Sequence, residues 1–103
     1  YYAEPQALGA RGAVLNLADG SLAIGDAQLE LTRNESRMLR LLLENKNKTV
    51  SREQLMRYLW DDEHFIDENT LTVNINRLRK KLAGAGLDGL IKTKKGEGYI
   101  VHE

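Results

Sequence analysis

The chain has 103 residues, with 15 basic side chains balancing 15 acidic ones, a size that suits one domain with a modest core. Cysteine is absent, which excludes a disulfide scaffold and a thiolate metal site and is compatible with a reducing cytoplasm. No apolar run is long enough to cross a bilayer and no signal-peptide pattern opens the sequence. We therefore expect a soluble, cytoplasmic domain without a membrane partner.

Residues 1–12 contain the only proline and show no clear period, which predicts a linker remnant or a disordered terminus. Because no methionine opens the chain, we interpret it as a piece of a longer protein, with one domain over residues 13–103. Within this domain, residues 13–31 hold short apolar runs separated by Asp19-Gly20 and Gly25-Asp26, which favour hairpin turns. We expect a small antiparallel sheet that acts as a scaffold.

A capping box, Thr32 followed three residues later by Glu35, marks the start of a first helix. Its apolar residues share one face, and the helix should end near residue 45. The inward-facing residues of this helix are Met38, Leu39, Leu42 and Leu43.

A second capping box, Ser51 to Gln54, opens a short helix that directs Leu55, Met56 and Leu59 inward. This would be the positioning helix of a helix-turn-helix, whose N-terminal N–H groups can face phosphate. Arg52 is a candidate phosphate contact, although plain solvation explains it equally well.

The next segment, residues 60–67 (WDDEHFID), is too long for the tight turn of a minimal helix-turn-helix, and long loops in compact domains are often functional. Five acids lie within residues 61–68, without a lysine or arginine, and suit a basic partner surface. The alternative is that three apolar side chains fill the core while the acids stay solvated. These three are Trp60, Phe65 and Ile66.

Residues 69–83 predict a third helix, because an apolar stripe recurs at helical spacing in Leu71, Ile75, Leu78 and Leu82. The opposite face is polar or cationic except for one valine. It comprises Asn69, Val73, Asn76, Arg77 and Lys80, flanked by Thr72 on one side and by Thr70 and Lys81 on the other. In the major groove, arginine can pair with guanine, asparagine with adenine, and an aliphatic side chain can contact a thymine methyl. On the helix alone, a solvated surface face is an equally good interpretation.

Residues 91–94 and 99–101 read as two strands joined by a turn that contains Gly96 and Gly98. Three lysines lie at or near the tip, where they suit phosphate contact or insertion into the minor groove: Lys92, Lys94 and Lys95. Over residues 69–95 there are seven basic residues and one acid, Asp88, so this half is strongly basic although the whole chain is neutral.

The run TLTVNINRLRKKL followed by TKKGEGY resembles the helix and wing signature of OmpR/PhoB-type response-regulator effector domains, and the similarity extends from residue 14 to the end. The resemblance implies an α+β fold: a winged helix-turn-helix with an N-terminal antiparallel sheet, three helices and a C-terminal hairpin wing. It also implies sequence-specific binding of double-stranded promoter DNA, with base contacts from Thr72, Val73, Asn76 and Arg77. Candidate phosphate contacts are Arg52, Asn69, Thr70, Asn74, Lys80 and Lys81, and candidate wing contacts are Thr93, Lys94 and Lys95.

The family's base preference is not transferred, because many members have arginine where this chain has Asn76 and Lys95, and histidine where it has Asn74. The resemblance also implies partners: an N-terminal receiver domain, a cognate histidine kinase, a second copy of the chain on direct DNA repeats, and RNA polymerase. The polymerase would be contacted by the loop residues Asp61, Asp62, Glu63, His64 and Phe65. Within the family, the sequence is most similar to regulators that answer peptide-antibiotic and cell-envelope stress.

Other functions have little support. Residues 84–89 match GxGxxG, but they follow a helix and precede a strand, whereas a dinucleotide fingerprint does the reverse. The only histidines, His64 and His102, are 38 positions apart and have no cysteine to complete a metal set, so no metal or cofactor is expected. No nucleophile lies in a recognisable motif, and we do not expect an enzyme. The alternative is a winged-helix protein-interaction module without DNA binding; recognition of structured RNA is disfavoured by the narrow A-form major groove.

Overall fold

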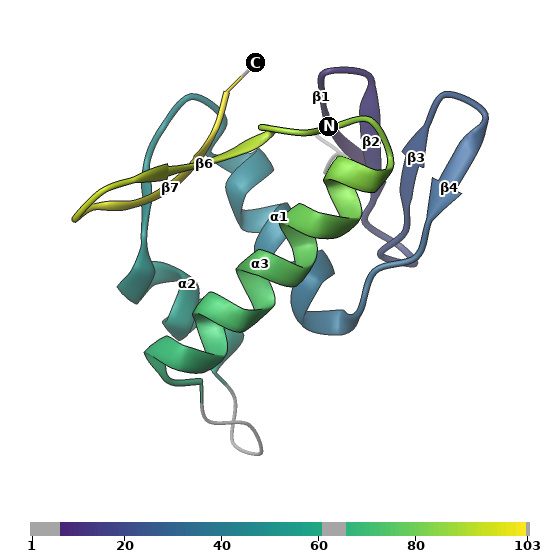
Figure 1. Cartoon of the computed structure of the whole chain (residues 1–103). Helices are drawn as coiled ribbons and strands as arrows, with labels where there is room; N and C mark the ends of the chain where they lie inside the picture. The colour runs from purple at the N-terminus through teal and green to yellow at the C-terminus, as the bar shows by residue number, and fades with distance from the viewer. Residues whose placement is uncertain (1–6, 61–65, 103) are drawn as a thin grey trace, which may run out of the picture.

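The computed structural model describes residues 7–60 and 66–102 (Figure 1). Its N-terminal part is an antiparallel meander in the order β1-β2-β3-β4. The strands are β1 (Ala7–Ala10), β2 (Ala13–Asn16), β3 (Leu22–Ile24) and β4 (Ala27–Leu29). Leu15 and Leu22 from this sheet are buried in the core. The small sheet predicted over residues 13–31 is therefore confirmed.

The N-terminal boundary differs from the prediction, because Ala7–Ala10 belongs to the sheet rather than to a linker. In this strand, Ala7 lies opposite Asn16 and Ala10 opposite Ala13. Gly9 allows the close approach, since a Cβ there would lie 2.9 Å from the carbonyl oxygen of Ala13. Small residues give this strand little β propensity, which explains why the sequence did not reveal it. The predicted linker residues 1–6 lie outside the described part of the chain.

Three helices follow the sheet: α1 (Arg33–Glu44), α2 (Arg52–Leu59) and α3 (Glu68–Gly84). Both predicted capping boxes are present, with Thr32 and Ser51 as the N-caps. Because each cap satisfies backbone N–H groups that a helix leaves unpaired, the two helices begin where the sequence places them. The apolar faces of α1 and α3 meet in the core, and α2 packs against both helices.

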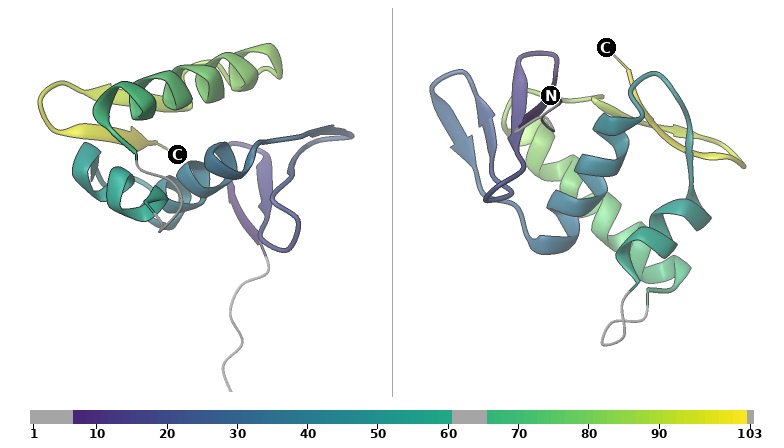
Figure 2. Two further views of the ribbon diagram at one scale, coloured as in Figure 1. Left: turned by 90° about the horizontal axis from the view of Figure 1, so that it is seen from below. Right: turned by 180° about the vertical axis from the view of Figure 1, so that it is seen from behind.

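The C-terminal sheet has the order β5-β7-β6, made from β5 (Val50–Ser51), β6 (Ile91–Lys94) and β7 (Gly98–Val101). The predicted wing hairpin is confirmed, whereas β5 is too short to be recognised in the sequence. Viewed from below, α3 forms one layer over α1 and α2, with the meander and the wing at opposite sides (Figure 2).

The glycine-rich segment after α3 is a helix end, in agreement with the sequence interpretation. The N–H of Leu87 donates to the carbonyl of Leu82, and the N–H of Gly86 donates to the carbonyl of Ala83. Gly86 has φ +87°, so these bonds form a Schellman motif.

A buried ion pair joins α1 to α3. The Glu35 carboxylate accepts from the backbone N–H of Thr32 at 2.8 Å and from Lys81 Nζ at 2.6 Å, and only 2% of the Glu35 side chain is exposed. Burial raises the pKa of Glu35, but the hydrogen bonds from Lys81 and Thr32 outweigh that effect and leave the pKa below its ordinary value.

Gly98 is the most constrained position of the wing. Its φ is +152°, and a Cβ would lie 2.1 Å from the carbonyl oxygen of Val50 on β5. We expect Gly98→Ala to destabilise the domain by at least about 2 kcal/mol, since β7 would have to move away from β5. Gly96→Ala is the control: Gly96 has φ +77° but no neighbouring atom within 4 Å, so only the left-handed conformation, about 1 kcal/mol, is penalised. If Gly98→Ala and Gly96→Ala lost the same free energy of unfolding in urea, the close approach of β7 to β5 would be contradicted.

Stability should depend on the Glu35 carboxylate in a defined pH range. Because the pKa is lower in the folded state, the ionised carboxylate stabilises the fold above its unfolded pKa of about 4.3, and this contribution is lost as the pH falls further. At pH 7, Glu35→Gln should cost about 1 to 2 kcal/mol in urea unfolding, and the difference from wild type should shrink at acidic pH. Glu44→Gln, which removes a half-exposed partner of Arg40, should change stability by less than about 0.5 kcal/mol. If the stability difference between Glu35→Gln and wild type did not change with pH, the stabilising role of the ionised Glu35 carboxylate would be contradicted.

Candidate nucleic-acid interface

The outer face of α3 carries the polar and cationic side chains that the helical period predicted. The stripe on the inner face is buried, with no residue more than 1% exposed: Leu71, Ile75, Leu78 and Leu82. On the other side, six predicted residues are exposed: Asn69, Thr72, Val73, Asn76, Arg77 and Lys80. Val73 is 46% exposed and offers an apolar contact among hydrogen-bonding groups.

The N-terminal turn of α3 is ordered by its own side chains. Asp67 is the N-cap and accepts from the backbone N–H of Thr70 at 2.7 Å; hydrogen bonds from Thr70 keep the pKa of this carboxyl below its ordinary value. Asn74 donates from Nδ2 to the carbonyl oxygen of Thr70 at 2.8 Å. These two candidate phosphate contacts, Thr70 and Asn74, are half-buried at the flank of the exposed face.

The guanidinium of Arg52, predicted as a phosphate contact, binds other residues of the protein. Nη1 donates to the Tyr99 hydroxyl, while Nη2 donates to the carbonyl of Glu68 at 3.1 Å and to Thr72 Oγ1 at 2.8 Å. The side chain therefore joins α2 to the first turns of α3 and to the wing.

The wing exposes every residue from Lys92 to Glu97. The turn is closed by a hydrogen bond from the N–H of Glu97 to the carbonyl of Lys94 at 2.8 Å. Thr93 is linked to α3, because its Oγ1 accepts from Arg79 Nη2. Helix α3 and the wing thus lie side by side, as Figures 1 and 2 show.

Lys81 makes a contact within the protein that the sequence analysis did not predict. Its Nζ pairs with the buried Glu35 carboxylate and lies 3.3 Å from the carbonyl oxygen of Glu30. A long lysine side chain at the boundary of the outer face has reached an internal carboxylate, so Lys81 forms a contact between α3 and α1, and its assignment to DNA phosphate stays a prediction.

The acidic loop is only partly covered by the structure. Asp61, Asp62, Glu63, His64 and Phe65, the candidate polymerase contacts, lie outside the described residues. At its ends, Ile66 is buried, as the core-filling interpretation predicted, but Trp60 is 53% exposed, so that interpretation is wrong for Trp60.

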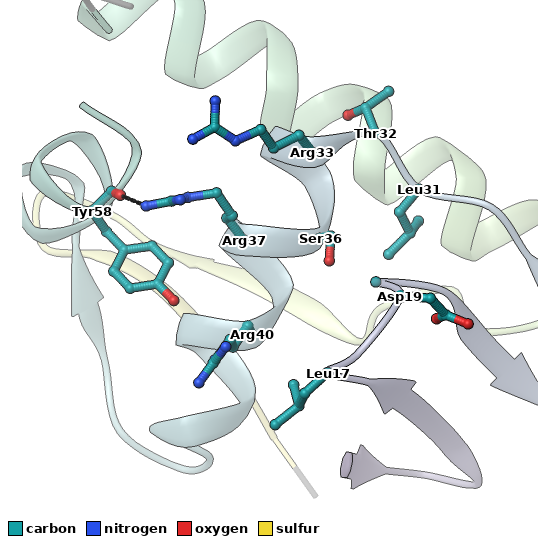
Figure 3. A pocket seen from close by; sticks show the side chains of 10 residues that line it. Leu17, Asp19, Leu31, Thr32, Arg33, Ser36, Arg37, Arg40 and Tyr58 are labelled. Atoms are coloured by element: carbon teal, nitrogen blue, oxygen red, sulfur yellow. Dashed lines mark hydrogen bonds between the residues drawn. The ribbon is translucent and has the colours of Figure 1, made fainter. Parts of the chain in front are cut away.

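A hollow of about 500 Å³ lies on the side of α1 away from α3, between α1, α2 and the β2–β3 connection (Figure 3). Arg37 crosses it, donates from Nη2 to the carbonyl of Tyr58 at 2.5 Å and stacks over the Tyr58 ring at 5.0 Å. Ser36 contributes a hydroxyl to the lining, but the described lining contains no histidine or other base beside it. We interpret this hollow as a junction between α1 and α2 rather than as an active site.

Within residues 7–60 and 66–102, no three histidine, cysteine or acidic side chains come together as a metal-ion site. In the same described ranges, none of the helices has the length and apolarity that crossing a membrane requires.

Sequence reasoning missed two residues of this region, Tyr99 and Arg79. Both guanidinium groups that contact the Tyr99 ring come from distant helices, and Arg52 lies 47 positions before the tyrosine. The helical period places Arg79 beside the buried stripe, but no local pattern pairs it with the wing.

The comparisons with known proteins agree with this geometry. Residues 26–101 match the family described as "Transcriptional regulatory protein, C terminal". The chain is 46% identical over 100 residues to the response regulator protein GraR of Staphylococcus aureus, covering 97% of this chain and 45% of GraR. It is 50% identical over 92 residues to the sensory transduction protein BceR of Bacillus subtilis, covering 89% of this chain and 40% of BceR.

A solved structure with a similar fold is the C-terminal domain of NsrR, a lantibiotic response regulator of nisin resistance. It superposes with a TM-score of 0.81 at 38% identity and covers 93% of this chain and 97% of the NsrR domain. The present chain spans less than half the length of GraR and BceR. Its family match, its identity to these regulators and its winged helix-turn-helix agree, and the chain belongs to the C-terminal, OmpR/PhoB-type domains of transcriptional regulatory proteins.

Proposed function

We propose that this domain binds double-stranded DNA in a sequence-specific manner and so controls transcription, with α3 in the major groove and the wing in the adjacent minor groove. The observation that carries the proposal is the exposed face of α3, lined by amide, guanidinium and ammonium groups, beside a wing whose lysines are also exposed. An α-helix fits the major groove, and cations suit the phosphates and the negative potential of the minor groove.

The residues divide by the chemistry they offer. Thr72, Val73, Asn76 and Arg77 present hydrogen-bonding and apolar groups suited to base edges. Asn69 and Lys80 suit phosphate oxygens, while Thr93, Lys94 and Lys95 form the wing contact. Contact to phosphate fixes the register of a protein on DNA, whereas base contact supplies preference, so these sets should respond differently to substitution.

The whole protein is proposed to be a cytoplasmic response regulator of a two-component system. GraR is named a response regulator, and this chain covers 45% of its length, which supports a longer protein with an N-terminal receiver domain and a cognate histidine kinase. The similarity to a lantibiotic response regulator supports a role in answering peptide antibiotics. RNA polymerase remains the proposed partner of residues 61–65, and a second copy the proposed partner on direct repeats.

The decisive experiment is selection of the domain against random DNA duplexes at two salt concentrations, followed by sequencing of the retained DNA. A short enriched motif, repeated in tandem about one helical turn apart, is the expected result. If nothing is enriched even at low salt, the protein-interaction module becomes the better function, and a repeat with the receiver domain restored would decide between them.

Arg77 should determine one position of that motif. Arg77→Ala should weaken binding to the selected duplex by roughly 1 to 3 kcal/mol and relax the preference at one base pair, because an arginine fork paired with guanine is lost. Titration against duplexes that carry each of the four base pairs at every position measures both effects. Unchanged affinity and preference would show that Arg77 does not face a base.

Lys80 and Lys94 should act through charge alone. Replacing either with glutamine should weaken every duplex alike and reduce the slope of log K against log salt by about 1. Arg11→Gln is the matched control, since Arg11 is exposed at the β1–β2 turn, in the meander on the side of α3 away from the wing (Figure 1). An equal change of slope for Arg11 would indicate a general effect of net charge and contradict the assignment.

A further inference from the structure

Tyr99 of β7 lies where α2, α3 and the wing meet. Only 5% of the residue is exposed, and its strand pairs with Val50 of β5 on one side and with Thr93 of β6 on the other. The guanidinium carbons of Arg52 and Arg79 lie over its ring, 5.7 and 5.3 Å from the centroid. Such cation–π contacts are strongest where the ring is withdrawn from water.

Each of the two arginines also holds a threonine of the candidate DNA surface. Arg52, bonded to the Tyr99 hydroxyl through Nη1, donates to Thr72 Oγ1 from Nη2 at 2.8 Å. Arg79 donates from Nη2 to Thr93 Oγ1 on the wing. The contacts therefore run without a break from Thr72 on α3, through the Arg52–Tyr99–Arg79 stack, to Thr93 on β6.

The chemistry of these bonds sets the direction of both threonine hydroxyls. A guanidinium can only donate, so Thr72 Oγ1 and Thr93 Oγ1 act as acceptors toward it. Each hydroxyl keeps its own proton for a second bond, and both residues are exposed. Phosphate oxygens only accept hydrogen bonds, and base edges in both grooves offer acceptors too.

From this geometry we infer that the Arg52–Tyr99–Arg79 stack is a positioning unit that fixes the wing relative to α3 and presents Thr72 and Thr93 as hydrogen-bond donors to DNA. Arg52 and Arg79 act through the threonines and do not themselves contact the duplex, which changes the role predicted for Arg52. The inference about DNA rests on the proposed function, whereas the positioning of the wing is a property of the domain alone.

The first test needs no DNA. In nuclear magnetic resonance spectra, a held guanidinium rotates slowly about its Cζ–Nε bond, so rotation at Arg52 should be slower than at Arg57. Arg57 is the matched control on the same helix, since its only described partner is the exposed Glu53 one turn away. Tyr99→Phe, which keeps the ring and removes the acceptor, should accelerate rotation at Arg52 and leave Arg57 unchanged. Equal rates at Arg52 and Arg57 in the wild-type domain would overturn the positioning unit.

The second test uses the duplex selected above. Tyr99→Phe alters no charge, and we expect it to weaken binding roughly three- to tenfold without changing the salt slope, because the loss is one hydrogen bond to a charged group. Arg52→Gln should also weaken binding, and its salt slope should equal that of Arg57→Gln. A direct phosphate contact by Arg52 would instead reduce the salt slope by about 1, as for Lys80→Gln.

The outcomes separate the two proposals. A reduced slope in Arg52→Gln, or full affinity in Tyr99→Phe, overturns the inference while DNA binding stands. If the wild-type domain binds no duplex, the DNA part falls together with the proposed function, and the rotation rates alone support or overturn the positioning of the wing. A thermal unfolding curve for each variant shows that the comparison is made on folded protein.

Discussion

Burial of one apolar row on α3 is the constraint on which the rest of the interface depends. Leu71, Ile75, Leu78 and Leu82 are all within 1% of complete burial and pack with α1 and α2. Because a helix spaces its side chains by a fixed angle, burying this row determines the direction of every other side chain on α3. The outward orientation of Asn76 and Arg77 is therefore a consequence of core packing. Their chemical identity, in contrast, is not determined by the core.

The position of the wing is fixed by a second constraint, because β5 and α2 follow one another without an intervening residue. Ser51 is the last residue of the strand and also the N-cap of the helix. It lies opposite Gly98, whose missing side chain lets β7 approach the backbone of β5. A movement of the wing must therefore disturb the start of α2, which carries Arg52. Helix orientation and wing position are thus coupled through backbone pairing as well as through the Tyr99 stack.

Features set by neighbouring residues could be predicted from the sequence, and features set by distant pairs could not. The capping boxes locate α1 and α2, and the glycines locate the wing turn, because each signal lies within a few residues of the structure it determines. In contrast, Ala7–Ala10 and Val50–Ser51 become strands only because β2 and β7 offer them partners. The small residues of Ala7–Ala10 do not favour a strand by themselves, and the two residues of Val50–Ser51 are too few to be recognised as one.

The same distinction applies to the residues of the predicted site. The period of α3 placed its exposed residues correctly, but charge alone assigned Lys81 and Arg52 to phosphate and did not reveal that both also bind buried partners within the protein. The side chain of a lysine or arginine at the edge of an exposed face is long enough to reach either solvent or an internal acceptor. Residues 69–95 contain seven basic side chains, of which Lys81 pairs with a buried carboxylate and Arg79 contacts the exposed Thr93 of the wing. The two differ in charge, because the Glu35 carboxylate compensates the ammonium of Lys81, whereas the Thr93 hydroxyl and the Tyr99 ring are neutral and leave Arg79 its positive charge beside the wing.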